Sequence, residues 1–456
     1  MNPVSDLSFM LRLAKMYLSD VNRLWNLNEE QLKRYQDNQF RRIVNYAYTV
    51  PMYHEKYKKH GIHPRDIQGI EDINKLPFIT KDDLRNNYPD GITPKNLHPR
   101  NSFTVSTSGS TGKPVFVVID RFSALKSLLG FVRALKAYGG NWRKSKVVLI
   151  IDTEPGSAEN AFFIEKIPVV SRLFKLENIK YLHLGEKPEK IMKILNEFQP
   201  DYLGSDPNML RQLAHLKENG FGEKVNPDYI LSSGSMLDDY TKQYVELAYG
   251  RRVLDAYGTT EGGPLSFECI KGDYHIHSDF VKIEFLDSED QPVPLNTPGH
   301  TVITKLYGAG TPIIRYRGID DIATPIKKET SCGITSDMIK KIEGRASELI
   351  YLPDGKTLSP LAVTGIPAKT MEYFNSYKIS HFQIVQHQLD DIEIKVVIDE
   401  KKNTEISSEK IIAELKKRFE EKIGPEVTIT VTQKDEIENE TQSHFSKVIV
   451  SKLSNK

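Results

Sequence analysis

The chain has 456 residues, of which 39% are hydrophobic and 27% are charged, and its 62 Lys and Arg residues nearly balance its 61 Asp and Glu residues. That length suffices for one large domain and a smaller one, and the balanced charge excludes a general attraction to nucleic acid or to an anionic membrane. Two cysteines, Cys269 and Cys332, are too few for a disulfide framework. We therefore expect a cytoplasmic protein without nucleic-acid or membrane partners.

The N-terminal part is expected to be helical. Apolar residues recur on one face of the stretch from residue 26 to residue 60, until Pro51 interrupts the pattern. Further along, Thr80 stands directly before KDDL, where a threonine hydroxyl caps a helix well. The chain thus begins with several short helices.

The middle of the chain, from Val115 to about Ile322, alternates short β-branched runs with longer helical ones. This alternation is typical of an α/β domain with largely parallel central strands. Strands dominate from about Tyr274 onward. The aromatic residues Phe131 and Tyr138 are expected in the core rather than in a binding pocket.

The last hundred residues predict a small α+β domain. A hairpin is expected around Leu389–Asp391, an amphipathic helix over Ser408–Ile423, and a final strand at EVTITVTQ. The change of character predicts a domain boundary near Gly344. We therefore expect a larger α/β domain over residues 1–344 and a smaller α+β domain over residues 345–456.

A loop with the sequence STSGSTGKP lies between two strand-like segments, SFTV and PVFVVI. Its glycines let the backbone approach an anion closely, its hydroxyl and amide groups can donate to phosphate oxygens, and Lys113 adds positive charge. It is not a Walker A sequence, because that pattern requires glycine where Thr107 stands. The flanking strands favour a phosphate-binding loop over a flexible linker.

Three further motifs follow. DAYGTTEGG begins at Asp255, directly after a strand, where ligands of open α/β sheets bind. In it Tyr257 could stack on a base, Thr260 could donate to a phosphate and Glu261 could bind Mg²⁺. RYRGIDDIA and IEGR supply an aspartate for ribose hydroxyls and, at Arg345, a cation for sugar or phosphate.

In this order and at these spacings, the four motifs resemble the acyl-adenylate-forming superfamily, in particular its phenylacetate-CoA ligase branch and that branch's capsule-biosynthesis-type relatives. The segment that begins RRIVNYAYTVPMYHEKYKKHG is similar to the branch's N-terminal region. The resemblance implies a large N-terminal α/β adenylate-forming domain, a smaller mobile C-terminal α+β domain, and an active site between them.

The resemblance also implies a reaction and its ligands. A small carboxylic acid, expected to be aryl or arylalkyl, attacks the α-phosphate of ATP, and the thiol of coenzyme A then displaces AMP from the acyl-AMP. Two alternatives stay open: an enzyme that loads the phosphopantetheine of a carrier protein, and a nucleotide-binding, non-ligating homologue in a polysaccharide pathway. A homodimer is compatible with each of them.

The family's site residues carry over by position. The expected catalytic groups are Thr260 at the α-phosphate, Glu261 at magnesium and Lys447 from the C-terminal domain. The residues expected to bind ATP or AMP are Thr107, Ser108, Gly109, Ser110, Thr111, Gly112, Lys113, Ser233, Gly234, Ser235, Met236, Asp255, Ala256, Tyr257, Gly258, Thr259, Asp321 and Arg345.

The sequence departs from the family pattern at several points. RYRGIDDIA is one residue longer than the family's motif, so that Asp321 is aligned with the ribose ligand and Asp320 stays an alternative. Ser347 stands where relatives commonly carry an aspartate as the domain hinge. The C-terminal lysine is matched to Lys447, while an ungapped alignment places Phe445 there and predicts poor adenylation.

A zinc site is a further expectation from the resemblance. Some relatives hold a structural zinc with a cysteine, a histidine six residues on and a C-x-C pair. Cys269, His275 and Cys332 match three of these ligands, but Thr330 occupies the fourth position. His277 would substitute only if its strand turned, and two inert thiols without zinc stay the alternative.

Overall fold

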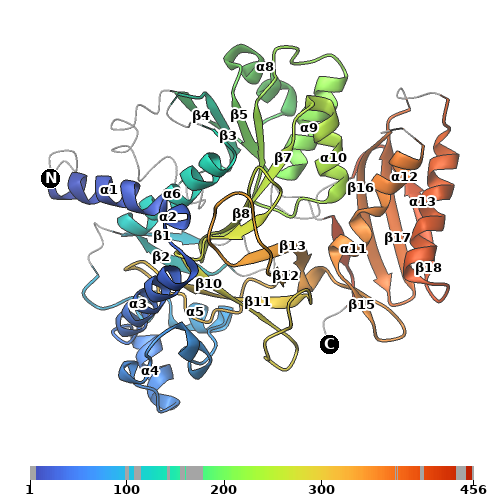
Figure 1. The fold of residues 1–456 in the computed structure, drawn as a ribbon. Coiled ribbons are helices and arrows are strands. Elements are labelled where there is room, and N and C mark those ends of the chain that lie inside the picture. Colours follow the sequence, from blue (N-terminus) through green and yellow to red (C-terminus); the bar gives the residue numbers. More distant parts are fainter. Residues whose placement is uncertain are drawn as a thin grey trace.

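The computed structural model describes residues 7–97, 102–106, 114–140, 144–154, 160, 178–374, 376, 378–400, 405–437 and 448–453. Its centre is an eleven-stranded sheet in the order β10-β11-β12-β13-β9-β8-β7-β6-β5-β3-β4 (Figure 1). The strands are β3 (Val147–Ile151), β4 (Ile179–His183), β5 (Tyr202–Ser205), β6 (Tyr229–Ser232), β7 (Val253–Thr259), β8 (Gly263–Glu268), β9 (Tyr274–Ile276), β10 (Val281–Leu286), β11 (Gly299–Lys305), β12 (Asp321–Ile326) and β13 (Met338–Arg345).

One half of this sheet is parallel, as the alternation of strands and helices predicts. Strands β3 to β7 pair in parallel, and the helices α8 (Pro188–Phe198), α9 (Pro207–Glu218) and α10 (Asp239–Tyr249) connect successive strands from β4 to β7. From β7 onward the pairing is antiparallel and begins with the β7–β8 hairpin. The strands that dominate after Tyr274 thus extend the sheet.

The segment PVFVVI forms a strand outside the large sheet. Strand β1 (Ser102–Ser106) pairs antiparallel with β2 (Phe116–Asp120), and together they form a separate two-stranded ribbon. This ribbon is joined to the connection between β11 and β12, where the Thr311 backbone N–H donates to the Val118 carbonyl at 2.7 Å.

The N-terminal part is helical, as predicted. Its elements are α1 (Leu7–Asp20), α2 (Arg23–Asn26), α3 (Glu29–Ala47), α4 (Pro51–Lys59), the 3₁₀ helices η2 (Pro64–Asp66) and η3 (Ile70–Lys75), and α5 (Lys81–Asn87). Pro51 is the first residue of α4, and the Thr80 hydroxyl accepts from the Asp83 backbone N–H, which caps α5.

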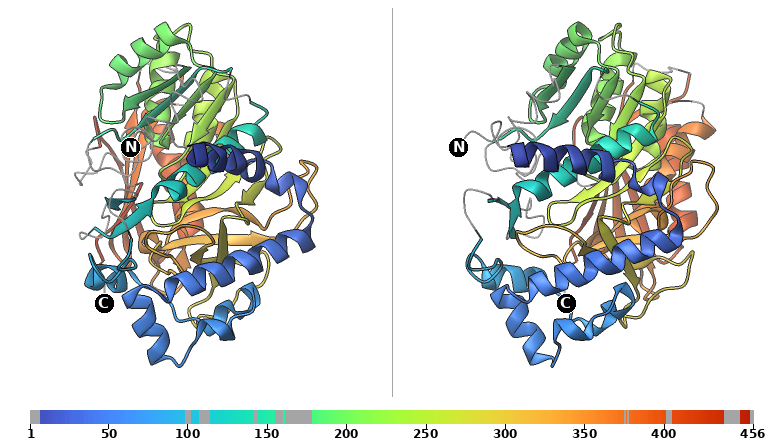
Figure 2. Two further views of the ribbon diagram at one scale, coloured as in Figure 1. Left: turned by 90° about the vertical axis from the view of Figure 1, so that its left-hand side faces the viewer. Right: turned by 60° about the vertical axis from the view of Figure 1, so that its left-hand side comes forward.

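Helix α6 (Arg121–Ala137) follows the ribbon and lies beside α1 (Figure 2). Tyr138, just beyond α6, is buried, and Phe131 is half-buried against the same apolar cluster. Both residues are therefore packed in the core, as expected. No helix in the described ranges is long and apolar enough to cross a membrane.

The C-terminal part forms a second sheet, of order β18-β17-β16-β19, with its own apolar core (Figure 1). Its elements are η7 (Ala346–Glu348), β14 (Ile350–Tyr351), β15 (Thr357–Leu358), α11 (Pro360–Thr364), α12 (Ile366–Tyr373), β16 (Ile379–Gln388), β17 (Asp391–Ile398), α13 (Ser408–Ile423), β18 (Thr428–Gln433) and β19 (Ile449–Ser451). The predicted hairpin and helix are present, and EVTITVTQ forms β18, but β19 follows it, so β18 is not the final strand.

One residue of the N-terminal part belongs to this second core. Tyr240, on α10, is completely buried against the apolar residues of the C-terminal sheet, and its ring meets that of Phe382 edge-on at 6.0 Å between centroids. Its hydroxyl donates to the Ile379 carbonyl. The two parts are thus joined by a buried side chain as well as by the chain between β13 and β14.

Candidate functional site

The expected phosphate loop leaves the tip of the β1–β2 ribbon. Ser106 and Phe116 are opposite each other in the last pair of the ribbon, which is therefore the end nearest the predicted loop in the sequence. The strands on both sides, which favoured a phosphate loop in the sequence, are present. The seven loop residues assigned to ATP, Thr107, Ser108, Gly109, Ser110, Thr111, Gly112 and Lys113, lie outside the described residues.

Two other predicted segments meet at the carboxyl edge of the parallel strands. Strands β6 and β7 are neighbours, with Ser232 opposite Asp255. The loop of Ser233, Gly234, Ser235 and Met236 therefore leaves the sheet beside Asp255, where the parallel pairing of β6 with β7 ends. Gly234 has a φ of +94°, a conformation that favours glycine. Carboxyl edges of parallel strands are where ligands of such sheets bind.

Asp255 is buried below this edge. It accepts a hydrogen bond from the Tyr274 hydroxyl at 2.9 Å. Burial, the dominant cause, raises the pKa of Asp255 to about 7. Ala256, Tyr257, Gly258 and Thr259 follow it along β7 and become more exposed toward the end of the strand.

Glu261 and Thr260 lie at the tip of the β7–β8 hairpin. Thr259 pairs with Gly263, so that residues 260–262 make the turn. Glu261 is buried and accepts a hydrogen bond from the Tyr316 hydroxyl at 2.9 Å. Burial raises the pKa of Glu261, since no cation pairs with its carboxylate in the described part of the chain. A carboxylate held in this way has one oxygen left for a cation.

Asp321, Tyr257 and Arg345 come together from three strands. Asp321 is opposite Arg345 in the β12–β13 pair, with 3.9 Å between its Oδ1 and the arginine Nε. The Tyr257 hydroxyl donates to Asp321 Oδ2 at 2.5 Å. Burial raises the pKa of Asp321 to about 6. Asp320, by contrast, accepts from the backbone N–H of Ser347 at 3.1 Å and caps the turn after β13. The geometry therefore favours Asp321 over Asp320 as the group that faces a ligand.

Sequence reasoning missed Tyr316. It belongs to the PIIRYR motif, yet the pattern alone does not tell which of its side chains points inward. The structure buries Tyr316 completely and directs its hydroxyl to Glu261, while Arg315 turns to Glu284 at 2.8 Å. Tyr316 thus orients the carboxylate that is expected at magnesium.

Lys447 and its rival Phe445 both lie outside the described residues. Strand β19, which begins two residues after Lys447, pairs in parallel with β16. The strand expected after the lysine is therefore present, and the choice between the two alignments stays a prediction.

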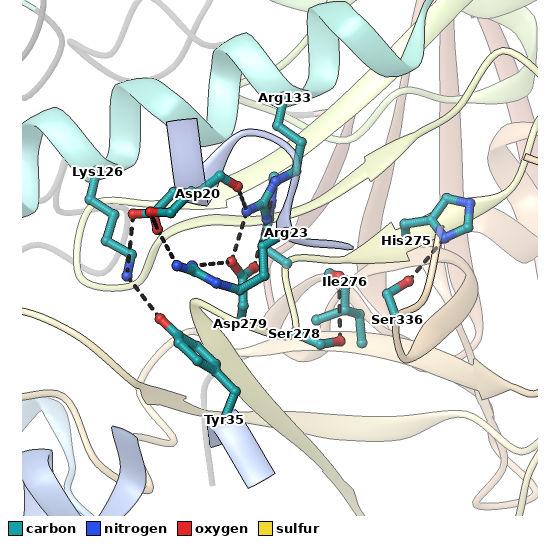
Figure 3. A network of polar contacts seen from close by, with 12 residues as sticks. Asp20, Arg23, Tyr35, Lys126, Arg133, His275, Ile276, Ser278, Asp279 and Ser336 are labelled. Carbon is teal, nitrogen blue, oxygen red and sulfur yellow. Dashed lines mark hydrogen bonds and ion pairs between the residues drawn. The ribbon is translucent and has the colours of Figure 1, made fainter. Parts of the chain in front are cut away.

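The predicted metal ligands do converge. One ligand atom each of Cys269, Asp273, His275 and Cys332 lie within 4.8 Å of one another. Cys332 Sγ is 3.2 Å from His275 Nε2, and His275 Nδ1 is 2.9 Å from the Ser336 hydroxyl (Figure 3). Burial lowers the pKa of His275 to about 4, so its ring is neutral and able to bind a metal.

Asp273 is the residue that the sequence reasoning missed in this group. It precedes β9 by one residue and lies two residues before His275, so both side chains leave the same face of the extended chain. His277, which was considered as the fourth ligand, turns away instead: its Nδ1 is 3.0 Å from Arg133 and its ring stacks on Phe280. Thr330 contacts Cys332 Sγ at 3.3 Å.

No family model matches the chain. It is 25% identical over 443 residues to the phenylacetate-coenzyme A ligase of Thermus thermophilus, which covers 90% of this chain and 93% of the relative. It is also 25% identical to protein CapK of Staphylococcus aureus, over 90% of this chain and 87% of the relative. The two likenesses are nearly end to end.

The fold agrees with this. A crystal structure of 2-hydroxyisobutyryl-CoA ligase in complex with 2-HIB-AMP, in the postadenylation state, superposes with a TM-score of 0.75 at 18% identity, over 91% of this chain and 88% of the other. The chain therefore resembles phenylacetate-CoA ligases along most of its length and shares the fold of an acid-CoA ligase. Its sequence relatives include phenylacetate-CoA ligases and protein CapK.

Proposed function

We propose that the protein activates a carboxylic acid with ATP to form an acyl-AMP and then transfers the acyl group to the thiol of coenzyme A. The observation that carries this proposal is that Arg345 lies close enough to Glu261 and to Asp321 for its charge to act on both buried carboxylates, while Tyr257 donates to Asp321. The near full-length likeness to phenylacetate-CoA ligases supports the same reaction.

In the proposed first step, the acid's carboxylate attacks the α-phosphate of ATP and pyrophosphate leaves. Two negative groups must approach each other, so the site has to supply positive charge and hydrogen-bond donors. Glu261 would hold Mg²⁺, which offsets charge on the phosphates, and Thr260 would donate to the α-phosphate. Asp321 would accept the ribose hydroxyls, and Arg345 lies beside it.

The proposed division into domains of residues 1–344 and 345–456 would allow the second half-reaction to use a different domain arrangement from the first. The C-terminal domain would rotate about the turn at Ser347, which needs only torsional freedom there, so that one site serves both half-reactions. Lys447 would stabilise charge on the α-phosphate during the first half-reaction.

A second candidate is a nucleotide-binding homologue that does not ligate, in a polysaccharide pathway. The near full-length likeness to protein CapK is the observation that supports this second candidate. The third candidate, loading of a carrier-protein phosphopantetheine, differs from the first only in the thiol.

A pyrophosphate-release assay separates these functions. A panel of carboxylic acids with ATP and Mg²⁺ is assayed with and without coenzyme A, and acyl-CoA is detected by mass. Pyrophosphate release with acyl-CoA formation is expected for at least one acid. Release that yields thioester only on a phosphopantetheinylated carrier protein would favour the third candidate, and nucleotide binding without any release would favour the second.

Glu261→Gln is the matched variant, with Glu289→Gln at an exposed position as its control. The amide keeps the shape and the bond from Tyr316 but lacks the charge that Mg²⁺ needs, so pyrophosphate release should fall by at least a hundredfold. The control should release pyrophosphate at the wild-type rate. Normal release by Glu261→Gln would remove this residue from the mechanism.

We also propose that Cys269, Asp273, His275 and Cys332 hold a structural zinc ion. Two thiolates, one neutral imidazole and one carboxylate are a suitable tetrahedral set, and Ser336 fixes the histidine ring from behind. The partner of Asp273 in the described residues is the exposed Lys328, which a metal ion could replace.

Metal analysis of protein purified without chelator tests the zinc proposal. One zinc per chain is expected, and Asp273→Ala should lose most of it. Thr330→Cys in the Asp273→Ala background should restore binding, because the new thiol would stand beside Cys332. A wild type without stoichiometric metal would leave two structural thiols and refute the proposal.

A further inference from the structure

A charge cluster is buried between α1, α2 and α6 (Figure 3). Arg133 donates to both oxygens of Asp279, at 2.7 and 2.8 Å, and Arg23 donates to the same carboxylate at 2.9 Å. Lys126 lies 3.6 Å from Asp20. Each cation of this cluster therefore has a carboxylate partner, which is the usual condition for buried charge.

Lys305, the last residue of β11, is a buried cation next to this cluster but lacks such a partner. Its residue is 6% exposed, and its Nζ lies 4.6 Å from the centroid of the Tyr307 ring. Within the described ranges, its ammonium makes no hydrogen bond or ion pair. Burial, only partly offset by the charge of Asp120, lowers the pKa of Lys305 to about 8.

Asp120 is committed elsewhere. Its Oδ1 accepts from the backbone N–H groups of Phe122 and Ser123, and its Oδ2 accepts from that of Ala309 at 2.7 Å. It therefore caps α6 and holds the turn after β11 rather than pairing with Lys305. A buried ammonium without a contacting anion is unfavourable, so an anionic ligand would be bound strongly there.

The side chain of Lys305 points to the back of the catalytic hairpin. Side chains two apart on a strand share a face, so Lys305 lies on the same face of β11 as Ile303. A Cβ on Gly262 would be 2.7 Å from Ile303 Cδ1, which puts this face against the hairpin tip. Gly263 has a φ of +74°, and a Cβ there would be 2.9 Å from the Tyr307 hydroxyl and 3.0 Å from Ser127 Oγ.

We propose that Lys305, with the Tyr307 and Ser127 hydroxyls, binds a second anionic group at the far end of the acid, so that the preferred substrate is a dicarboxylate rather than a simple monocarboxylate. This proposal rests on the proposed function, because it assumes that the reacting carboxylate lies beside Thr260 and Glu261. The two hydroxyls are 3.0 Å apart, and Ser127 also donates to the Ser123 carbonyl at 3.1 Å. The Tyr307 hydroxyl is therefore the donor for an added carboxylate, with Ser127 beside it.

Lys305 is too far from the predicted phosphate loop to bind the phosphates of ATP. Asp120, the residue whose charge acts on Lys305, ends the β1–β2 ribbon opposite Ser102, whereas the phosphate loop leaves the other end at Ser106 and Phe116. Five residues of strand separate these ends by about 13 Å.

Matched acids test the proposal. Glutarate is compared with pentanoate, and para-phenylenediacetate with para-ethylphenylacetate, in the pyrophosphate-release assay. The wild type should prefer the dicarboxylate of at least one pair by a factor of ten or more in kcat/KM, since a buried ammonium without its anion discriminates strongly. Lys305→Met should reverse that ratio through KM. A wild-type preference for both monocarboxylates would overturn the proposal.

A binding measurement separates this proposal from the reaction itself. Calorimetric titration of the same acids into the AMP complex requires no catalysis, so it reports on Lys305 even if no acid is turned over. Lys305→Met should weaken dicarboxylate binding at least tenfold and leave monocarboxylate binding within twofold. Equal losses for both members of a pair would assign Lys305 a structural role.

Thermal unfolding provides the structural control. Because Lys305 has no ion-pair partner among the residues that the structure describes, Lys305→Met should unfold at the wild-type temperature or a few degrees above it. The dicarboxylate should raise the melting temperature of the wild type only. Lys126→Met is the contrasting variant, since it leaves Asp20 with one cation fewer and should melt earlier. A marked loss of stability in Lys305→Met would show a structural pairing and refute the proposal.

Discussion

Buried carboxylates occur in two regions of this molecule, and their pKa values are shifted in opposite directions. In the charge cluster at α6, two arginines contact Asp279 and lower its pKa to about 2, although it is fully buried. Asp255 and Asp321, near the proposed nucleotide site, are also buried, yet burial raises their pKa values to about 7 and about 6. Paired charge indicates a structural role, and under-compensated charge indicates a place kept for a ligand.

The largest expected effect breaks the paired region. Asp279→Asn leaves Arg133 and Arg23 without their shared carboxylate, and an orphaned buried charge costs about 3–5 kcal/mol of unfolding free energy. Denaturant unfolding, followed by circular dichroism, measures the loss. A loss of less than about 1 kcal/mol in unfolding free energy is what removal of an exposed ion pair would cause. Such a result would mean that the cluster does not stabilise the fold.

A substitution at Asp321, near the proposed nucleotide site, should raise the unfolding free energy rather than lower it. Asp321→Asn removes a desolvated carboxylate and keeps an acceptor for the Tyr257 hydroxyl, so stability at pH 8 should rise by about 1 kcal/mol. Nucleotide affinity, measured by calorimetry, should fall at least tenfold because the ribose loses a charged acceptor. Asp320→Asn is the matched control and should keep wild-type affinity, since its side chain caps a turn.

The pH dependence of stability follows from the same contrast. The pKa of Asp279 is lowered, so its contribution is present above the unfolded value of 3.8 and is lost as pH falls toward 2. The pKa values of Asp255 and Asp321 are raised, so the native state binds more protons and stability falls as pH rises from about 4 to about 7. Urea unfolding between pH 3 and 8 should therefore give a maximum near pH 4 to 5, and the decline above it should be smaller in Asp255→Asn.

The smallest expected effect concerns Tyr240. Tyr240→Phe keeps the ring in the C-terminal core but removes the hydrogen bond to the Ile379 carbonyl, which should cost about 1 kcal/mol. Thermal unfolding measures it, with Tyr373→Phe at an exposed ring as the control. A loss confined to the control would contradict the packing described here.

Local patterns were readable from the sequence. The helix over Ser408–Ile423 and the hairpin around Asp391 follow from apolar periodicity and turn residues, and both are present with those bounds or nearly so. The motif around Glu261 was found because its residues are contiguous. Contacts between distant segments were not readable: Arg133 and Asp279 are 146 residues apart, and no local pattern pairs them.

Asp273 illustrates the same limit within the metal group. Its neighbours Cys269 and His275 were identified through a family pattern that has a cysteine where this chain has Thr330. The fourth ligand, Asp273, lies just before β9 rather than near Thr330, so it could be recognised only once the β9–β13 pairing had brought the Cys332 segment to His275. Tyr316 and Lys305 were missed for a related reason, because a strand's pattern does not tell which face meets the hairpin.

The anchoring of Tyr240 also bears on how fast the protein can work. In the proposed second half-reaction the C-terminal domain rotates, and this side chain has to leave a hydrophobic interior in every cycle. Emptying a cavity of that size costs about 3–5 kcal/mol if nothing refills it. The withdrawal of this one aromatic ring would then be the rate-limiting step of turnover, slower than the chemical steps before and after it.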